Sequence, residues 1–332
     1  MGWHVPELCG VHLHDCHHSH SCHHLMSQAA DTFHVFSNPF GFKGIRKHFY
    51  QAVRTGMTAG IMSEAGDPLN VGGTIRKFRH QIYRKLFEKH IRFIFAAGDI
   101  GRQWFIDGGY PTKKIFDWGY FIQSETHNEL PRQICNSLNS PNINIVIVAS
   151  QISRKAYPWV LNALNRVTQK NWHLHIIGDG PQRQANKRLV QSLGISSHVT
   201  FHGALDNLTV RAFLKRADFS LLASHHDGWG VVVNESLLAG TPVICSNACG
   251  ASAMIKSSLA GQVFQAGATG SLATCIEQQI RKGKLSNESR QTLVDKSSRI
   301  NATSAARTFL QMIEEPMAYL LQREQEGPWY RI

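Results

Sequence analysis

Two carboxylates and two glycines stand close together near residue 230 and could surround an anionic ligand. Asp227 and Glu235 flank a turn with Gly228 and Gly230, and a helix is predicted to begin at Val231. The first amides of a helix have no partner inside it, and glycines let a phosphate approach the backbone closely. The segment therefore predicts a phosphate site between two acids. A helix start without any ligand is the alternative.

A basic turn earlier in the chain offers the matching cations. Arg154 and Lys155 follow a short apolar run at 145–149. An arginine can bond two phosphate oxygens at once, and a lysine adds a compact positive charge. We therefore expect both to hold a diphosphate, with a solvated basic loop as the alternative.

These loops need a framework, and the hydrophobic pattern predicts one. Short apolar runs alternate with helical spacing from residue 145, which is typical of a doubly wound parallel sheet with ligands outside the carboxyl ends of its strands. A polar stretch at 137–144 is the expected linker. The first half predicts strands at 33–36, 59–63 and 91–97 and a basic amphipathic stretch at 74–90. The second half predicts strands at 145–149, 173–177, 199–202, 219–223 and 242–246, with helices at 158–168, 182–193, 208–217 and 231–239.

Composition sets the class of protein and the chemistry of its partners. The 332 residues suffice for two domains, and 42% hydrophobic with 17% charged residues is typical of a globular chain. Seven scattered cysteines and no signal-peptide pattern at the start indicate the cytoplasm. Of the net charge of +12, residues 43–114 contribute fourteen basic against five acidic residues, or +9. Such a surface attracts phosphate-bearing partners such as an anionic membrane, unless it serves only solubility.

The segment Asp227–Glu235, followed by Gly240-Thr241-Pro242-Val243, resembles the acidic signature of retaining nucleotide-sugar glycosyltransferases of family 4, the glycosyl transferases group 1. That signature begins with Glu-Gly-Phe-Gly, and here the shorter Asp227 replaces its first acid. The basic turn is similar to the family's Gly-x-Leu-x-x-Arg-Lys-Gly, with Ala149 and Ala156 at the glycine positions and Ser150 where many members have arginine. Further similar segments are Ile176–Pro181, Val199–Gly203 and Ala217-Asp218-Phe219.

The resemblance implies an α/β fold of the GT-B type, with two Rossmann-like, doubly wound parallel-sheet domains facing across a cleft. Residues 1–138 would bind the acceptor, 139–305 the nucleotide sugar, and a terminal helix at 306–332 would pack back toward the first domain. The implied reaction moves a sugar, with retention, from a nucleoside-diphosphate sugar to a glycan or phospholipid-linked acceptor in cell-surface polysaccharide or glycoconjugate synthesis. The enzyme would be cytoplasmic, at the inner face of the membrane.

The resemblance also assigns roles to individual residues. Glu64 follows the strand at 59–63, where the family often has a histidine near the reacting sugar, so it becomes an acceptor-side catalytic group; a loop or helix-capping carboxylate is the alternative. No Asp-x-Asp pair is present, so no metal or other cofactor is expected. The catalytic candidates are Glu64, Asp227 and Lys155, and the donor-binding candidates are Arg154, Lys155, Gly203, Gly228, Trp229, Gly230, Val231 and Glu235.

The amino terminus is rich in possible ligands: eight histidines and three cysteines fall in the first 24 residues. Their spacing fits no common zinc motif, so we favour a strand at 8–13 and a loop from which His14, Asp15 or His17 touches the acceptor. For the chain as a whole, the main alternative function is a non-catalytic nucleotide-sugar-binding partner of a transferase. The spacing of Asp227 and Glu235 argues against an epimerase or phosphorylase. Charge alone suggests a nucleic-acid binder, but the sequence has no recognition module, so no nucleic-acid partner is expected. The donor base and sugar, the acceptor and linkage, and the oligomeric state are not written in the sequence.

Overall fold

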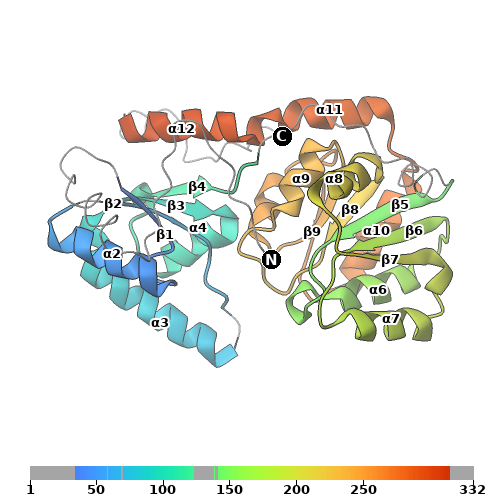
Figure 1. Ribbon diagram of the computed structural model, residues 1–332, viewed down its shortest axis with the longest axis horizontal. Coiled ribbons are helices and arrows are strands. Elements are labelled where there is room, and N and C mark those ends of the chain that lie inside the picture. The colour runs from blue at the N-terminus through green and yellow to red at the C-terminus, as the bar shows by residue number, and fades with distance from the viewer. Residues whose placement is uncertain (1–33, 58, 69, 123–137, 139–140, 315–332) are drawn as a thin grey trace.

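The computed structural model describes residues 34–57, 59–68, 70–122, 138 and 141–314, which form two α/β domains (Figure 1). The expected strand at 8–13, the acceptor-facing His14, Asp15 and His17, and most of the linker lie outside these residues. So do residues 315–332 of the terminal helix.

The amino-terminal domain is built on a parallel sheet in the order β1-β2-β3-β4. Each predicted strand is present, with β1 shifted by one or two residues, and the amphipathic stretch forms α3 and a following 3-10 turn. The bounds are β1 Val35–Ser37, α2 Lys43–Arg54, β2 Ala59–Ser63, α3 Asn70–Phe87, β3 Ile91–Ala97, α4 Gly98–Asp107 and β4 Ile115–Trp118.

The two faces of this sheet are covered by different parts of the chain. One face packs against α2 and α4 through Phe49 and Phe105, both buried. The opposite face presents Phe95 and Trp118, and the last helix, α12 (Ala302–Glu314), covers them with Phe309. Figure 1 shows α12, in red, running across the amino-terminal domain after the chain has left the other one. The domain boundaries at 138/139 and 305/306 stay predictions.

The carboxy-terminal domain has a parallel sheet in the order β10-β9-β8-β5-β6-β7. The chain winds outward in both directions from β5, so the strand order reverses between β5 and β8. Every predicted strand and helix is present. The bounds are β5 Ile143–Val148, α6 Tyr157–Arg166, β6 Trp172–Ile177, α7 Arg183–Ser192, β7 Val199–Gly203, α8 Asn207–Arg216, β8 Phe219–Leu222, α9 Val232–Leu238, β9 Val243–Ser246, β10 Gly261–Phe264, α10 Thr269–Arg281 and α11 Asn287–Ser297.

β5 is apolar on both sides because helices cover both faces of its sheet. Ile145 and Ile147 join the core cluster under α6 and α10, while Val146 belongs to the opposite cluster with Phe213 of α8. All three are buried. A continuous apolar run is therefore what this central strand requires, and it fixes the position of the turn that follows.

Candidate active site

The carboxyl ends of β5 and β8 bring the basic and acidic turns into contact. The Lys155 ammonium donates a hydrogen bond to Oδ2 of Asp227 and forms an ion pair with it. The Arg154 guanidinium lies 3.1 Å from Oδ1 of the same carboxylate and donates to the His226 carbonyl at 3.0 Å. The strand order reverses at this point of the sheet, where doubly wound folds bind ligands. Two cations thus converge on one acid at the expected place.

Backbone hydrogen bonds fix the two turns. The His225 amide donates to the Arg154 carbonyl at 2.9 Å, which ties the turn after β8 to the turn after β5. The amide of Asp227 donates to Ala248 at 2.9 Å, and its carbonyl accepts from Gly250 at 3.0 Å. Asp227 is 8% exposed. The carboxylate is therefore held in place by the domain rather than by its ion pairs alone.

The amino-terminal domain contributes a second carboxylate from across the interface. A Cβ atom added to Gly228 would lie 1.8 Å from Oε2 of Glu64, so only glycine allows this approach. The Tyr120 hydroxyl donates to Oε1 of Glu64 at 2.6 Å. Burial raises the pKa of Tyr120, and the hydrogen bond to Glu64 and its charge raise it further. Tyr120 therefore stays a proton donor to this carboxylate at physiological pH.

A buried amide connects Tyr120 to the glycine turn. The Asn234 side chain donates to the Tyr120 carbonyl at 2.7 Å and accepts from the Trp229 indole at 2.7 Å. Both Asn234 and Trp229 are fully buried. This network fixes the segment after β4 against the start of α9.

These side chains surround one hollow of about 280 Å³ between the domains. Its wall includes six residues that the sequence singles out and three that it does not. The six are Glu64, Lys155, Asp227, Trp229, Gly230 and Val231, and the others are Tyr120, Val148 and Val232.

Four predicted donor-binding residues do not line this hollow: Arg154, Gly203, Gly228 and Glu235. Arg154 and Gly228 nevertheless adjoin residues that do, because Arg154 pairs with Asp227 and Gly228 follows it in the chain. Glu235 is half-buried on α9, where desolvation raises its pKa and the charge of Arg211 lowers it. Gly203 ends β7 with φ +77°, and its carbonyl accepts from the Gly178 amide at 2.7 Å. Both stay candidates for parts of the donor distant from the two cations.

Sequence reasoning assigned no role to Tyr120 or Asn234. Tyr120 belongs to no recognised motif, and Asn234, although it lies within the segment Asp227–Glu235, is neither an acid nor a glycine of that signature. Tyr120 follows Gly119 at the end of β4, and its partner Glu64 is 56 residues away. The turn residue Ala156 has a φ of +47°, which is in the left-handed region. It stands at a position where the family has glycine, and this backbone conformation gives the physical reason for that glycine.

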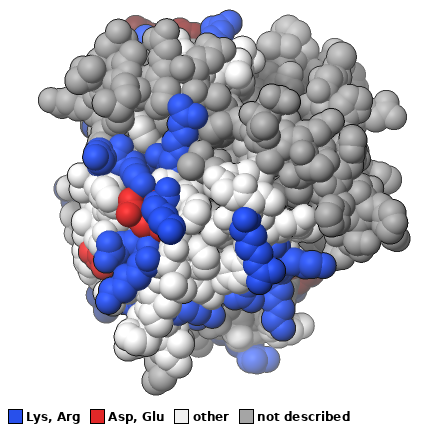
Figure 2. All heavy atoms as spheres, turned by 90° about the vertical axis from the view of Figure 1, so that its left-hand side faces the viewer, with Lys and Arg blue, Asp and Glu red and all other residues white. Residues whose placement is uncertain are grey.

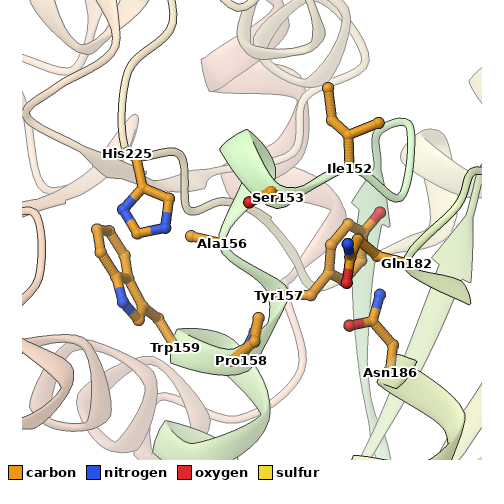
Figure 3. Close-up of a pocket in the computed structure, with 9 residues that line it drawn as sticks. All are labelled: Ile152, Ser153, Ala156, Tyr157, Pro158, Trp159, Gln182, Asn186 and His225. Carbon is orange, nitrogen blue, oxygen red and sulfur yellow. The ribbon is translucent and has the colours of Figure 1, made fainter. Parts of the chain in front are cut away.

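A second hollow of about 140 Å³ lies beside the basic turn (Figure 3). On one side of it, the rings of Trp159 and His225 meet edge to face with their centroids 4.2 Å apart. On the other side lie Gln182, the residue before α7, and Asn186 on α7. The turn from Ser153 to Ala156 runs between the two sides. This hollow therefore adjoins the segment that positions Arg154 and Lys155.

The described residues contain neither a cluster of possible metal ligands nor a helix that could span a membrane. In 34–314, less the gaps given above, no group of three or more His, Cys, Asp or Glu is arranged to hold a metal ion. Within the same residues, each helix is too short or too polar to cross a bilayer.

Comparison with known proteins shows what the carboxy-terminal half is similar to. Residues 133–296 match the family model described as Glycosyl transferases group 1. The matched segment is just under half of the chain. Residues of this chain are 29% identical, over 166 residues, to the lipopolysaccharide core biosynthesis glycosyltransferase LpsE of Rhizobium meliloti (strain 1021), a match covering 49% of the chain and 47% of the relative. A 41.2 kDa protein of the cps region of Klebsiella pneumoniae is 23% identical over 68% of the chain and 60% of the relative. The matches thus span less than two thirds of either relative.

Solved structures extend the likeness over both domains. HepE of Anabaena, crystallised in complex with UDP, superposes with a TM-score of 0.70 at 14% identity, covering 88% of this chain and 81% of that one. The lipopolysaccharide outer core galactosyltransferase WaaB gives 0.66 at 17% identity, covering 89% and 79%. The two domains therefore form a GT-B fold, as expected.

Proposed function

We propose that this protein is a retaining glycosyltransferase of family 4. It would transfer a sugar from a nucleoside-diphosphate sugar to a glycan or phospholipid-linked acceptor, in the synthesis of cell-surface polysaccharide or glycoconjugate. The observation that carries the proposal is the convergence of Lys155 and Arg154 on Asp227 at the switch point, with Glu64 facing them from the other domain. The names of LpsE and WaaB support the same class of reaction.

In this proposal the two cations bind the donor diphosphate. Lys155 lines the hollow between the domains, and Arg154 pairs with the same carboxylate, so we expect a diphosphate in the hollow to attract both positive charges. Asp227 would keep both side chains in place and orient the sugar. Trp229, Gly230 and Val231 border the same hollow. The amides from Gly228 to Val231 would bind the diphosphate, and Glu235 and Gly203 would bind the nucleoside.

The reaction breaks the bond between the anomeric carbon and the diphosphate oxygen and forms one to the acceptor oxygen. Negative charge grows on the departing diphosphate, where Lys155 and Arg154 stabilise it electrostatically. The acceptor hydroxyl loses its proton to the Glu64 carboxylate or to the leaving diphosphate. With two cations at the diphosphate, we propose that no divalent metal is needed. The enzyme would act in the cytoplasm, at the inner face of the membrane.

A thermal-shift screen against UDP, GDP, ADP and their common sugars tests the donor site. A ligand present at about 100 times its Kd stabilises the native state by about 2.7 kcal/mol. We expect one nucleotide to raise Tm and Lys155→Ala to abolish that shift. Lys296→Ala removes the same kind of side chain from the exposed surface of α11 and should retain the full shift.

Turnover separates a transferase from a protein that only binds the nucleotide sugar. The cognate donor, incubated with lipid-linked acceptors, should release its nucleotide diphosphate at a rate that EDTA leaves unchanged and Glu64→Gln lowers about 100-fold or more. Donor binding with neither transfer nor hydrolysis would contradict the enzymatic function. An inverted anomeric centre in the product would contradict retention.

A further inference from the structure

The outer face of α3 carries an apolar stripe that is exposed to solvent. Ile75, Phe78, Ile82 and Leu86 follow one another at intervals of three or four residues, so they share one face of the helix. Their exposed fractions are 60%, 65%, 39% and 56%. Four large apolar side chains in line on one helix form a contiguous patch, which in soluble proteins marks an interaction surface.

The opposite face of α3 already supplies the contacts that the fold needs. His80 is buried against Trp104, and Tyr83 stacks on Phe40 with ring centroids 4.7 Å apart. The apolar stripe therefore contributes little to the core of this domain, and its exposure is not a consequence of a poorly packed helix.

Positive charge accompanies the stripe. Lys77, Arg79 and Lys85 are exposed on α3, and the neighbouring α2 exposes Lys43 and Lys47. The two helices touch where Arg46 donates to the Tyr83 hydroxyl at 3.2 Å, and neither helix contains Asp or Glu. Figure 2 shows the side of the amino-terminal domain on which these helices lie, with Lys and Arg spread over its described part and few acidic residues among them. This charge is complementary to an anionic surface.

The same helix borders the candidate active site. Arg76, His80 and Tyr83 on its inner face line a hollow of about 100 Å³ together with Glu64. A lipid-linked acceptor held at the outer face of α3 would thus lie beside a helix that forms part of the wall around Glu64. The exposed stripe and the hollow on the inner face therefore both support a membrane as the partner of this helix.

We propose that α3 docks on an anionic phospholipid bilayer. Phe78, Ile82 and their two neighbours in the stripe enter the boundary between headgroups and acyl chains, as amphipathic interfacial helices do, and the flanking lysines and arginines bind lipid phosphates. The biological purpose of this docking rests on the proposed function, because it brings the enzyme to a lipid-linked acceptor. The binding itself needs no catalysis and can be measured alone.

Vesicle flotation tests the surface. Full-length protein should float with vesicles of phosphatidylcholine containing about 30% phosphatidylglycerol, float at least about 10-fold less with phosphatidylcholine alone, and be released by salt, which screens the lipid charge. Two variants should each lower the amount of bound protein about 10-fold. One removes the apolar stripe with Phe78→Ser and Ile82→Ser, and the other removes charge with Lys77→Gln, Arg79→Gln and Lys85→Gln. Leu310→Ser, at an isolated exposed leucine of α12, is the matched control and should float like the native protein.

Three results would overturn the proposal. Absence of flotation, or equal flotation of native protein and stripe variants, excludes this face as the docking surface. Size-exclusion chromatography with light scattering that shows a dimer, lost in the stripe variant, would assign the stripe to a second copy of the chain. The nucleotide thermal shift keeps the two proposals separate: a normal shift without flotation refutes docking alone, and flotation without any shift refutes the transferase alone.

Discussion

Tyr120 is the residue that links the Glu64 carboxylate of the candidate site to the interface between the domains. Its hydroxyl donates to Glu64, while its carbonyl accepts from Asn234 in the carboxy-terminal domain. The two contacts can be separated, because one uses the side chain and the other the backbone. A change confined to the hydroxyl therefore tests the orientation of Glu64 without breaking the bond between the domains.

We expect Tyr120→Phe to lower kcat/KM about 10-fold or more, because a hydrogen bond to a charged group contributes about 1.5–3 kcal/mol. Tm should fall modestly, and the nucleotide thermal shift should stay within error of the native protein. Steady-state kinetics of nucleotide release is the measurement. Tyr110→Phe removes a hydroxyl from the core of the amino-terminal domain and serves as the control. Equal rates for both variants would show that the Tyr120 hydroxyl does not act through Glu64.

At the scale of elements, the sequence predicts the carboxy-terminal sheet well because each strand is a short apolar run between clear turns. Ile145–Val148 and Phe219–Leu222 are such runs, and a doubly wound order places the turns after them side by side. That is how the closeness of the basic turn and the acidic turn could be predicted from the sequence. The contact of Glu64 with Tyr120 could not, since it depends on how two strands of the other domain end against Gly228. The packing of α12 likewise has no local signal.

A histidine pair between β6 and β7 makes the stability of the carboxy-terminal domain sensitive to acid. His175 Nδ1 lies 3.1 Å from His202 Nε2, and both rings contact Phe213 of α8. Burial, together with the smaller effects of the charges of His173 and His202, lowers the pKa of His175 to about 3. The native state therefore keeps this imidazole neutral at pH values where the unfolded chain, with a pKa near 6.5, binds a proton.

The sign of the pH dependence follows from that difference. The stability contributed by neutral His175 is complete above pH 6.5 and is lost as pH falls toward 3, with a slope approaching about 1.4 kcal/mol per pH unit. We expect urea unfolding of His175→Gln to show a shallower loss of unfolding free energy between pH 6.5 and 4.5. Between pH 7 and 8, the unfolding free energies of the native protein and the variant should change with pH to the same extent. Identical slopes in the acid range would contradict a neutral buried His175.

At the scale of the whole molecule, α12 is the element that fixes the orientation of the amino-terminal domain relative to the carboxy-terminal domain. The chain leaves the carboxy-terminal domain at Asn301, which pairs with Ile122, and α12 then packs Phe309 on Phe95 and Trp118. Among the described residues, Lys256 and Asp99 form an ion pair between the domains at 3.3 Å, and both side chains are exposed to solvent. Exposed ion pairs contribute little to stability, so the apolar contact of α12 carries more of the orientation.

We therefore expect Phe309→Ala to lower the free energy of unfolding of the amino-terminal domain by about 2 kcal/mol, less than the 3–5 kcal/mol for a fully buried phenylalanine, because Phe309 is only partly buried. Nucleotide binding should persist, since Lys155 and Asp227 belong to one domain. Transfer should fall, since Glu64 depends on how the other domain is held. Three measurements check these effects. Denaturant unfolding, followed by tryptophan fluorescence, measures stability; the nucleotide thermal shift measures binding; and turnover measures transfer. Leu310→Ala, an exposed neighbour on α12, should change none of them. Loss of nucleotide binding in Phe309→Ala would show instead that the donor site itself depends on contact with the amino-terminal domain.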